Sequence, residues 1–194
     1  MRSWDALPDV PLGPAGQVTE EFIRLRVRDY RGASCYLNRL PYGRNSSRTD
    51  ALAVLRESCG TCSTKHALLK LLAVEQQIEI ALVVGIYEMS ERNTPGVGRV
   101  LAKYSLTCVP EAHCYLRYDG IRIDVTRALA EAPAEPIGHF LYEEEITPPQ
   151  VGEYKVHLHQ DFIRRWLAQR RNVLGYEYDE IWRIREQCIA ALRA

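Results

Sequence analysis

The sequence predicts one α+β domain, in which a helix that begins at a cysteine packs on an antiparallel sheet. Residues 67–73 are a run of strong helix formers that directly follows Cys62 and small hydroxyl residues, and residues 78–87 are rich in β-branched side chains. Residues 112–126 contain an Asp-Gly turn signal between two runs of alternating polarity. We therefore expect strands over 78–87, 112–118 and 121–126, with helical extensions at both ends of the domain, 1–194.

The composition argues against several classes of partner. The 194 residues include 25 basic and 25 acidic side chains, so a net charge of zero supports neither a nucleic-acid binder nor a membrane-surface protein. No apolar run approaches the roughly 20 residues of a membrane-spanning helix, and the first residues lack the apolar region of a signal peptide. We expect a cytoplasmic protein whose six cysteines are free thiols.

The N-terminal part of the chain predicts short helices between loops. Residues 1–17 are rich in proline and glycine and are expected to be irregular. Thr19 is the expected N-cap of a helix that continues to Val27. The helical pattern stops from Gly32 to Asp50, and a short helix is expected over 51–56.

The C-terminal half predicts surface segments and two helices. A polar loop is expected over 90–99, and residues 100–106 fit a helix or a strand equally well. In the proline-rich and acidic region 131–151, the run from Glu143 to Glu145 is expected to be solvated. Amphipathic helices are expected over 161–171 and 178–192.

Cys62 lies at the expected start of a helix, directly after Gly60 and Thr61. The unpaired amides and the positive end of the helix macrodipole at such a position favour a thiolate over a thiol. This placement suits a nucleophile, although Cys62 also fits a buried structural cysteine. Cys59 is the rival nucleophile, and His66, one turn into the helix, is expected to pack rather than to catalyse.

The register of the expected hairpin brings a histidine and an aspartate to one face. With Asp119-Gly120 at the centre of the turn, the cross-strand pairs are Tyr118–Ile121, Arg117–Arg122, Leu116–Ile123, Tyr115–Asp124 and His113–Thr126. The face that carries Leu116, Ile121 and Ile123 is the expected core face. His113 and Asp124 lie on the opposite face as diagonal neighbours, near enough for the carboxylate to orient the imidazole.

Cys62, His113 and Asp124 thus provide a nucleophile, a base and a group that orients the base. Three motifs follow one another along the chain: Gly60-Thr61-Cys62 before an apolar helix, then Ala112-His113, then Ile123-Asp124-Val125-Thr126. With these motifs the chain resembles the transglutaminase-like superfamily of papain-like thiol enzymes over about residues 45–127. By matching position, Cys62 resembles the nucleophile of that family, His113 its base and Asp124 its third member. Cys114 and Val125 depart from the family pattern, which leaves the substrate subfamily open.

The resemblance implies a transglutaminase-like core and acyl transfer from an amide or a related acyl donor, through an acyl-thioester on Cys62. Water as the acceptor makes the enzyme a protease or amidase, and an amine makes it a transferase; both acceptors stay open. The expected substrate is a peptide, a protein or a small amide. No cofactor and no metal ion are expected.

Other residues are candidates for binding the substrate. The backbone amide of Cys62 is a natural oxyanion-hole donor. The family supplies a second, side-chain donor from upstream of the nucleophile, for which Tyr42 and Asn45 are the candidates. Three further residues share the face of the expected base and are candidates for substrate binding: Tyr115, Arg117 and Arg122. The two arginines could meet an anionic substrate group or simply be solvated.

The Cys59-x-x-Cys62 pair also fits two other hypotheses. A zinc site would need completion by Cys108, His113 or Cys114, although strand parity turns the last two to opposite faces. A redox dithiol of the thioredoxin type would need a strand directly before the motif, and the preceding segment does not fit one. The metal content of the protein and the mutual dependence of the two cysteines separate these hypotheses from a triad.

Overall fold

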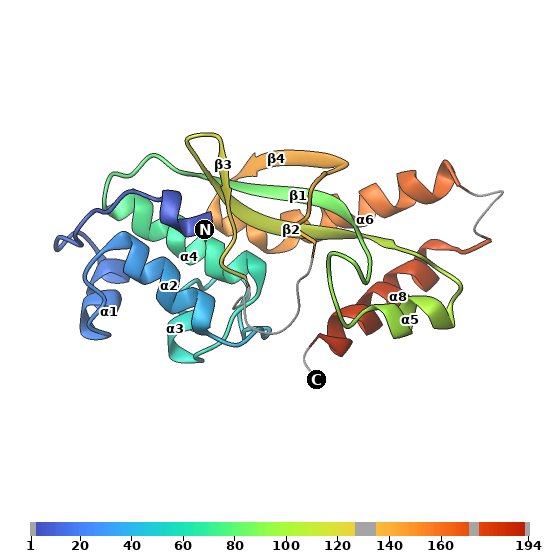
Figure 1. Cartoon of the computed structure of the whole chain (residues 1–194), viewed down its shortest axis with the longest axis horizontal. Helices are drawn as coiled ribbons and strands as arrows, with labels where there is room; N and C mark the ends of the chain where they lie inside the picture. The colour runs from blue at the N-terminus through green and yellow to red at the C-terminus, as the bar shows by residue number, and fades with distance from the viewer. Residues whose placement is uncertain (1–2, 127–134, 171–174, 193–194) are drawn as a thin grey trace. The chain divides into compact units, whose positions relative to one another are not determined.

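The computed structural model describes residues 3–126, 135–170 and 175–192, and these have the α+β architecture that the sequence predicts. Four antiparallel strands form a sheet in the order β3-β2-β1-β4 (Figure 1). The strands are β1, Ala81–Met89; β2, Val109–Tyr118; β3, Ile121–Ile123; and β4, Tyr142–Ile146. The first three correspond to the three expected strands, and β4 is not among the expected ones.

The chain divides into two compact units. The first consists of Met1–Val84, Cys114–Ala128 and Glu144–Gly152, and the second consists of Gly85–His113, Leu129–Glu143 and Glu153–Ala194. The expectation of one domain over 1–194 stays a prediction, and each unit is described by itself. Two expected boundaries, the end of the catalytic core at residue 127 and a helix end at Arg171, lie outside the described residues.

Helix α4, Cys62–Glu75, is the central helix of the first unit. Every residue from 62 to 69 is buried, so the N-terminal half of the helix contacts protein all round its circumference. Figure 1 shows it beside α1 and α2, and the helices and turn that contact it are α1, Gln17–Arg24; α2, Tyr30–Arg39; α3, Ala53–Arg56; and the 3-10 turn η2, Pro148–Val151. This packing holds the first residue of α4 in a fixed place.

The expected N-cap of the first long helix is wrong. Helix α1 begins after Gly16, and Thr19 is buried inside it. The carboxylate of Glu75 takes the place of a cap by accepting the amides of Val18 at 3.0 Å and Thr19 at 2.7 Å. A Cβ on Gly16 would lie 2.4 Å from that carboxylate, so the glycine allows the distant cap to approach.

Helix α2 corrects a second expectation, since the sequence pattern predicts no helix between Gly32 and Asp50. The carboxylate of Asp29 caps α2 by accepting the Gly32 amide at 2.6 Å. Few residues of α2 are strongly apolar, but burial of one face stabilises the helix despite this weak pattern. The buried apolar residues are Tyr30, Ala33 and Leu37.

The β2–β3 hairpin has the predicted register near its turn. Three pairs form as expected: Leu116–Ile123, Arg117–Arg122 and Tyr118–Ile121. Asp119 and Gly120 have φ angles of 47° and 73°, the left-handed values that a type I′ Asp-Gly turn requires. Strand β3 ends at Ile123, so the ladder does not include Asp124 or Thr126, and the two further expected pairs are wrong.

The expected restriction of the hairpin core to one face is wrong for most of β2. All residues of β2 from Val109 to Leu116 are buried, as is usual for an interior strand that is covered on both faces. Conversely, Ile121 belongs to the expected core face and is 47% exposed. Parity therefore predicts which hairpin residues share a face, but not which face is solvated.

Replacing Gly120 with alanine is expected to lower the free energy of unfolding by about 1 kcal/mol, because an L-residue is strained at a φ of 73°. Gly13→Ala is the matched control, since a Cβ at either glycine meets nothing within 4 Å and only Gly120 has a positive φ. Urea titration measures both variants. Equal losses for the two would contradict the left-handed turn.

The second unit contains α5, Gly98–Lys103; α6, Glu153–Ala168; and α8, Tyr178–Ala191. Helix α8 contacts both of the others, and Figure 1 shows α5 alongside it. The two amphipathic C-terminal helices are confirmed, although α6 begins at Glu153 rather than at Asp161. Across the described residues, we find no helix with both the length and the apolarity to cross a bilayer.

Strand β4 refines the expectation for the acidic run. Glu143 and Glu145 are exposed, as expected for a solvated run, but they belong to a strand at one edge of the sheet. Charged side chains on an edge strand oppose pairing with the edge of another molecule. A run of three glutamates has low intrinsic strand propensity, so the pairing with β1 decides its conformation.

Candidate functional site

Cys62 is the first residue of α4, as the sequence predicts, and Thr61 is the N-cap before it. Thr61 and Thr64 form a capping box, in which the Thr64 hydroxyl accepts the Thr61 amide at 3.0 Å and the Thr61 hydroxyl accepts the Thr64 amide at 3.4 Å. Cys62 is 7% exposed. Its thiol therefore lies, largely shielded from solvent, at the positive end of a 14-residue helix.

The loop with the candidate oxyanion donors runs beside the residues that lead to Cys62. Tyr42 and Gly60 form a parallel bridge. The Gly43 amide donates to the Gly60 carbonyl at 3.2 Å, and the Gly60 amide donates to the Pro41 carbonyl at 3.2 Å. These bonds hold Tyr42 close to the helix start, and its role as an oxyanion donor stays a prediction.

The side chain of Asn45 supports the same loop. Its amide nitrogen donates to the Cys59 carbonyl at 2.9 Å and to the Glu57 carboxylate at 3.1 Å. Its oxygen accepts the Thr64 hydroxyl at 2.7 Å. Because both polar ends of the amide are engaged in this way, the contacts favour a positioning role for Asn45 over the oxyanion role.

His66 is completely buried, and its hydrogen bonds define its protonation state. Nδ1 lies 2.7 Å from the Cys62 carbonyl oxygen, and Nε2 accepts the Val125 amide at 2.9 Å. A carbonyl oxygen only accepts, so Nδ1 carries the proton and the imidazole is neutral. Nε2 is 3.7 Å from Oδ1 of Asp124 but, as an acceptor, donates nothing to it. This arrangement supports the expected packing role.

Asp124 follows β3 in a turn that is bound to α4. Its Oδ1 accepts the Thr126 amide at 2.8 Å, and its own amide donates to the Ser3 hydroxyl at 3.1 Å. The side chain is 37% exposed. Two side chains of α4 bind the residues that follow Asp124: His66 accepts the next amide, and Lys65 donates to the Thr126 carbonyl at 3.0 Å. The Asp124 segment therefore lies against the helix that begins at the candidate nucleophile.

Lys65 is a site residue that the sequence analysis missed. It is completely buried, and Nζ donates to the Leu40 carbonyl at 2.6 Å as well as to the Thr126 carbonyl. A lysine three residues after a cysteine at a helix start was the signal, because residues i and i+3 are neighbours on a helix. Burial lowers the pKa of Lys65 to about 8, and the charges that three nearby acidic groups can carry partly oppose this: Asp124, Cys59 and Cys62.

His113, the predicted base, belongs to the second unit, whereas Cys62 and Asp124 belong to the first. His113 is 8% exposed and lies on β2, and its ring meets that of Tyr87 edge to face with centroids 6.1 Å apart. The assembly of the three residues into a triad therefore stays a prediction.

The three candidate substrate contacts lie on the hairpin of the first unit. Tyr115 is 1% exposed, and the Arg122 guanidinium lies 5.0 Å above its ring centroid in a cation–π contact. Arg117 is exposed and lies directly opposite Arg122 in the β2–β3 ladder. Burial makes Tyr115 a packing residue, and the substrate-binding roles of the two arginines stay predictions.

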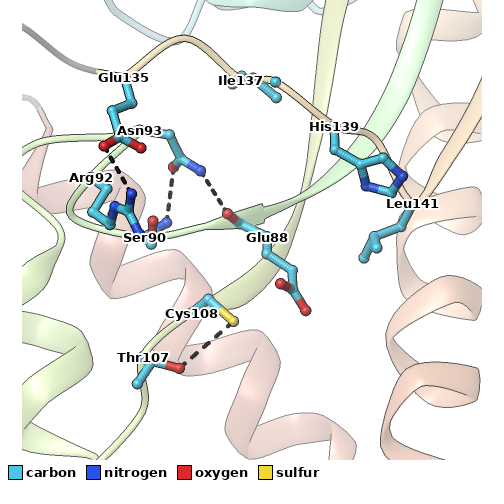
Figure 2. A pocket seen from close by; sticks show the side chains of 11 residues that line it. Glu88, Ser90, Arg92, Asn93, Thr107, Cys108, Glu135, Ile137, His139 and Leu141 are labelled. Atoms are coloured by element: carbon cyan, nitrogen blue, oxygen red, sulfur yellow. Dashed lines mark hydrogen bonds and ion pairs between the residues drawn. The ribbon is translucent and has the colours of Figure 1, made fainter.

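A cavity of about 410 Å³ lies in the second unit, and none of the predicted site residues lines it (Figure 2). Figure 2 shows Glu88 and Cys108 on its wall, with the segment from Glu135 to Leu141 along one side. Burial and the nearby Glu88 carboxylate raise the pKa of Cys108. This thiol therefore lacks the activation that a second nucleophile would need.

Three observations concern the alternative hypotheses for Cys59 and Cys62. All six cysteines are free thiols, as expected. Over residues 3–126, 135–170 and 175–192, no three His, Cys, Asp or Glu side chains are grouped so as to hold a metal ion. Helix α3 occupies the segment before the motif, where a thioredoxin-type dithiol would need a strand.

The fold and the site together define an α+β protein with a cysteine at the start of a buried helix, a buried lysine one turn further on and an aspartate segment bonded to that helix. Comparisons with protein-family models, curated proteins and solved structures find no match to this chain. The evidence for its function therefore consists of its residues and their geometry.

Proposed function

We propose that this protein is a transglutaminase-like thiol enzyme that transfers an acyl group from an amide or a related donor through an acyl-thioester on Cys62. The observation that carries the proposal is the attachment of the Asp124 segment to α4 through Lys65 and His66. This attachment lies within one unit and links the candidate nucleophile helix to the candidate third member. The placement of Cys62 at a capped helix N-terminus supports the same reading.

In the proposed reaction His113 accepts the proton of the Cys62 thiol, and the thiolate attacks the acyl carbon of the donor. The resulting oxyanion accepts a hydrogen bond from the Cys62 amide, with Tyr42 as the candidate second donor. When the intermediate collapses, the C–N bond breaks and the proton on His113 passes to the leaving amine. Asp124 stabilises the imidazolium during these steps.

The acyl-thioester is then resolved by an acceptor that restores the thiol. Water yields a carboxylic acid, and a second amine yields a new amide. The choice depends on how well the acceptor channel excludes water. A screen that offers each acyl donor with and without a primary amine, and identifies products by mass, distinguishes a hydrolase from a transferase.

The test of the proposal is the pH dependence of alkylation at each cysteine, located by peptide mass mapping. We expect Cys62 to react fastest, with a midpoint well below the value of about 8.5 for a free thiol. In His113→Ala the midpoint is expected to rise, because the imidazolium that stabilises the thiolate is gone. His139→Ala, which changes an exposed histidine, is the control and is expected to match the wild type.

Two results would overturn the proposal. Cys62 could prove inert, or its alkylation could be the same in His113→Ala as in the wild type. Joint protection of Cys59 and Cys62 until a chelator is added, together with stoichiometric metal in the purified protein, would replace the enzyme by a metal site.

A further inference from the structure

Lys65 combines three properties that are seldom found together in a lysine. Its side chain is completely buried, it points from the first turn of α4, and its ammonium group donates to two backbone carbonyls, those of Leu40 and Thr126. Gly60 leaves space for the stem, since a Cβ there would lie 2.9 Å from Cγ of Lys65. The fold therefore accommodates a buried cation beside the start of the helix.

The two carbonyls satisfy hydrogen bonds of the ammonium group but do not neutralise its charge. A buried charge is costly unless an opposite charge compensates for it. The groups that interact electrostatically with Lys65 are Asp124, Cys59 and Cys62. Asp124 is the first of these groups, but it is 37% exposed, so solvent screens its charge. The Cys62 thiol is buried on the same turn of α4, where a charge is screened less.

We propose that Lys65 is a positioning residue whose buried ammonium group stabilises the thiolate of Cys62. The inference deepens the proposed function and rests on it, since it assigns to Lys65 the activation of the proposed nucleophile. A cation one helical turn from a thiol lowers the free energy of the thiolate, and the low dielectric of a buried site strengthens the effect. The positive end of α4 acts in the same direction.

Lys70 is a matched control on the same helix. Its ammonium group also donates to a backbone carbonyl, that of Ile80, at 2.6 Å. It lies two turns beyond Cys62, the first residue of α4, whereas Lys65 lies one turn from it. A general effect of removing a lysine from α4 would appear in both variants, and an effect through the thiolate would appear for Lys65 alone.

The experiment measures the midpoint pH of Cys62 alkylation in Lys65→Gln, Lys65→Arg and Lys70→Gln. Glutamine keeps hydrogen-bond donors without the charge, and arginine keeps the charge. We expect Lys65→Gln to raise the midpoint by about one pH unit, so that alkylation near neutral pH slows about tenfold. Lys65→Arg and Lys70→Gln are expected to stay near the wild type. No shift in Lys65→Gln, or an equal shift in Lys70→Gln, would overturn the inference.

A second measurement uses the wild-type protein and covers the case in which Lys65→Gln does not fold. The ammonium group of Lys65 is titrated by NMR before and after methylthiolation of Cys62, which removes the thiolate. Because coupling between two groups is reciprocal, we expect the pKa of Lys65 to fall after the modification. An unchanged titration would contradict the inference.

His113→Ala, measured in parallel, separates this inference from the proposed function. A midpoint that rises in His113→Ala but not in Lys65→Gln overturns the role of Lys65 and leaves the acyl-transfer proposal standing. The reverse pattern overturns the acyl-transfer proposal and supports the coupling of Lys65 to Cys62.

Discussion

His113→Ala is expected to lower kcat/KM for acyl transfer by at least about 10⁴-fold, because Cys62 then keeps its proton and the leaving amine receives none. Cys62→Ala is expected to cost at least as much. The double variant should be no slower than the worse single variant, since a nucleophile and its base act as a unit. The measurement is the rate with any amide or ester donor that the wild type consumes.

Cys59→Ser and Asp124→Asn are the informative comparisons for this prediction. Cys59→Ser is expected to retain activity within a few-fold, because Cys59 precedes the helix and is not the proposed nucleophile. Asp124→Asn keeps an oxygen that can accept the Thr126 amide but loses the charge, so a large loss of rate without unfolding would assign the effect to the charge. Equal losses in Cys59→Ser and Cys62→Ala would contradict the triad and favour a dithiol.

Arg185→Met is expected to lower the free energy of unfolding of the second unit by about 3–5 kcal/mol at neutral pH. Arg185 binds the buried carboxylate of Glu111 through two parallel bonds, Nε to Oε2 at 2.5 Å and Nη2 to Oε1 at 2.7 Å. Glu111 is 6% exposed. Without Arg185, the Glu111 carboxylate stays buried without its bidentate partner. Leaving this one charge uncompensated costs more free energy than removing both charges of the pair.

The same ion pair predicts how the effect changes with pH. Burial alone would raise the pKa of Glu111, but the charge and hydrogen bonds of Arg185 outweigh burial and hold the pKa well below its usual range. The wild type therefore has the stabilisation above about pH 4.3 and loses it as the pH falls toward the lowered pKa. In Arg185→Met, burial raises the pKa of Glu111 instead, so the carboxylate becomes protonated as the pH falls and the penalty for its buried charge disappears. The difference in free energy of unfolding between the wild type and Arg185→Met therefore narrows as the pH falls.

Two variants serve as controls for the ion pair. Arg183→Met removes an exposed arginine of the same helix and is expected to change stability by less than about 0.5 kcal/mol. Arg185→Met combined with Glu111→Gln removes both charges and is expected to recover most of the loss. Urea titration followed by tryptophan fluorescence, in a Trp4→Phe background, reports on this unit, since the remaining tryptophans, Trp166 and Trp182, belong to it. A double variant as unstable as Arg185→Met would contradict the argument.

Local signals in the sequence predict the elements around Cys62 and Asp124 well. The Asp-Gly dipeptide specifies two left-handed residues, and this requirement determines the register of three strand pairs. The residues before Cys62 favour a helix start, and the Thr61–Thr64 capping box forms there. Both features depend on neighbouring residues only, which is why pattern and turn chemistry suffice.

Other elements depend on contacts that no local pattern contains. The amides at the start of α1 are capped by Glu75, which is more than 50 residues away in the sequence. Helix α2 forms on a sequence with a weak apolar pattern because one face is buried. The glutamate run of β4 is a strand because it pairs with β1. In each case a distant segment overrides the local preference.

The sequence by itself determined where the Cys62 helix begins, the register of the hairpin that precedes Asp124 and the α+β class. Only the tertiary structure decided that the imidazole of His66 is neutral and that Lys65 is buried with its ammonium group bonded to two carbonyls. The physical reason is distance along the chain. The carbonyls that bind the Lys65 ammonium belong to residues 25 positions before it and 61 positions after it, and only folding brings them together.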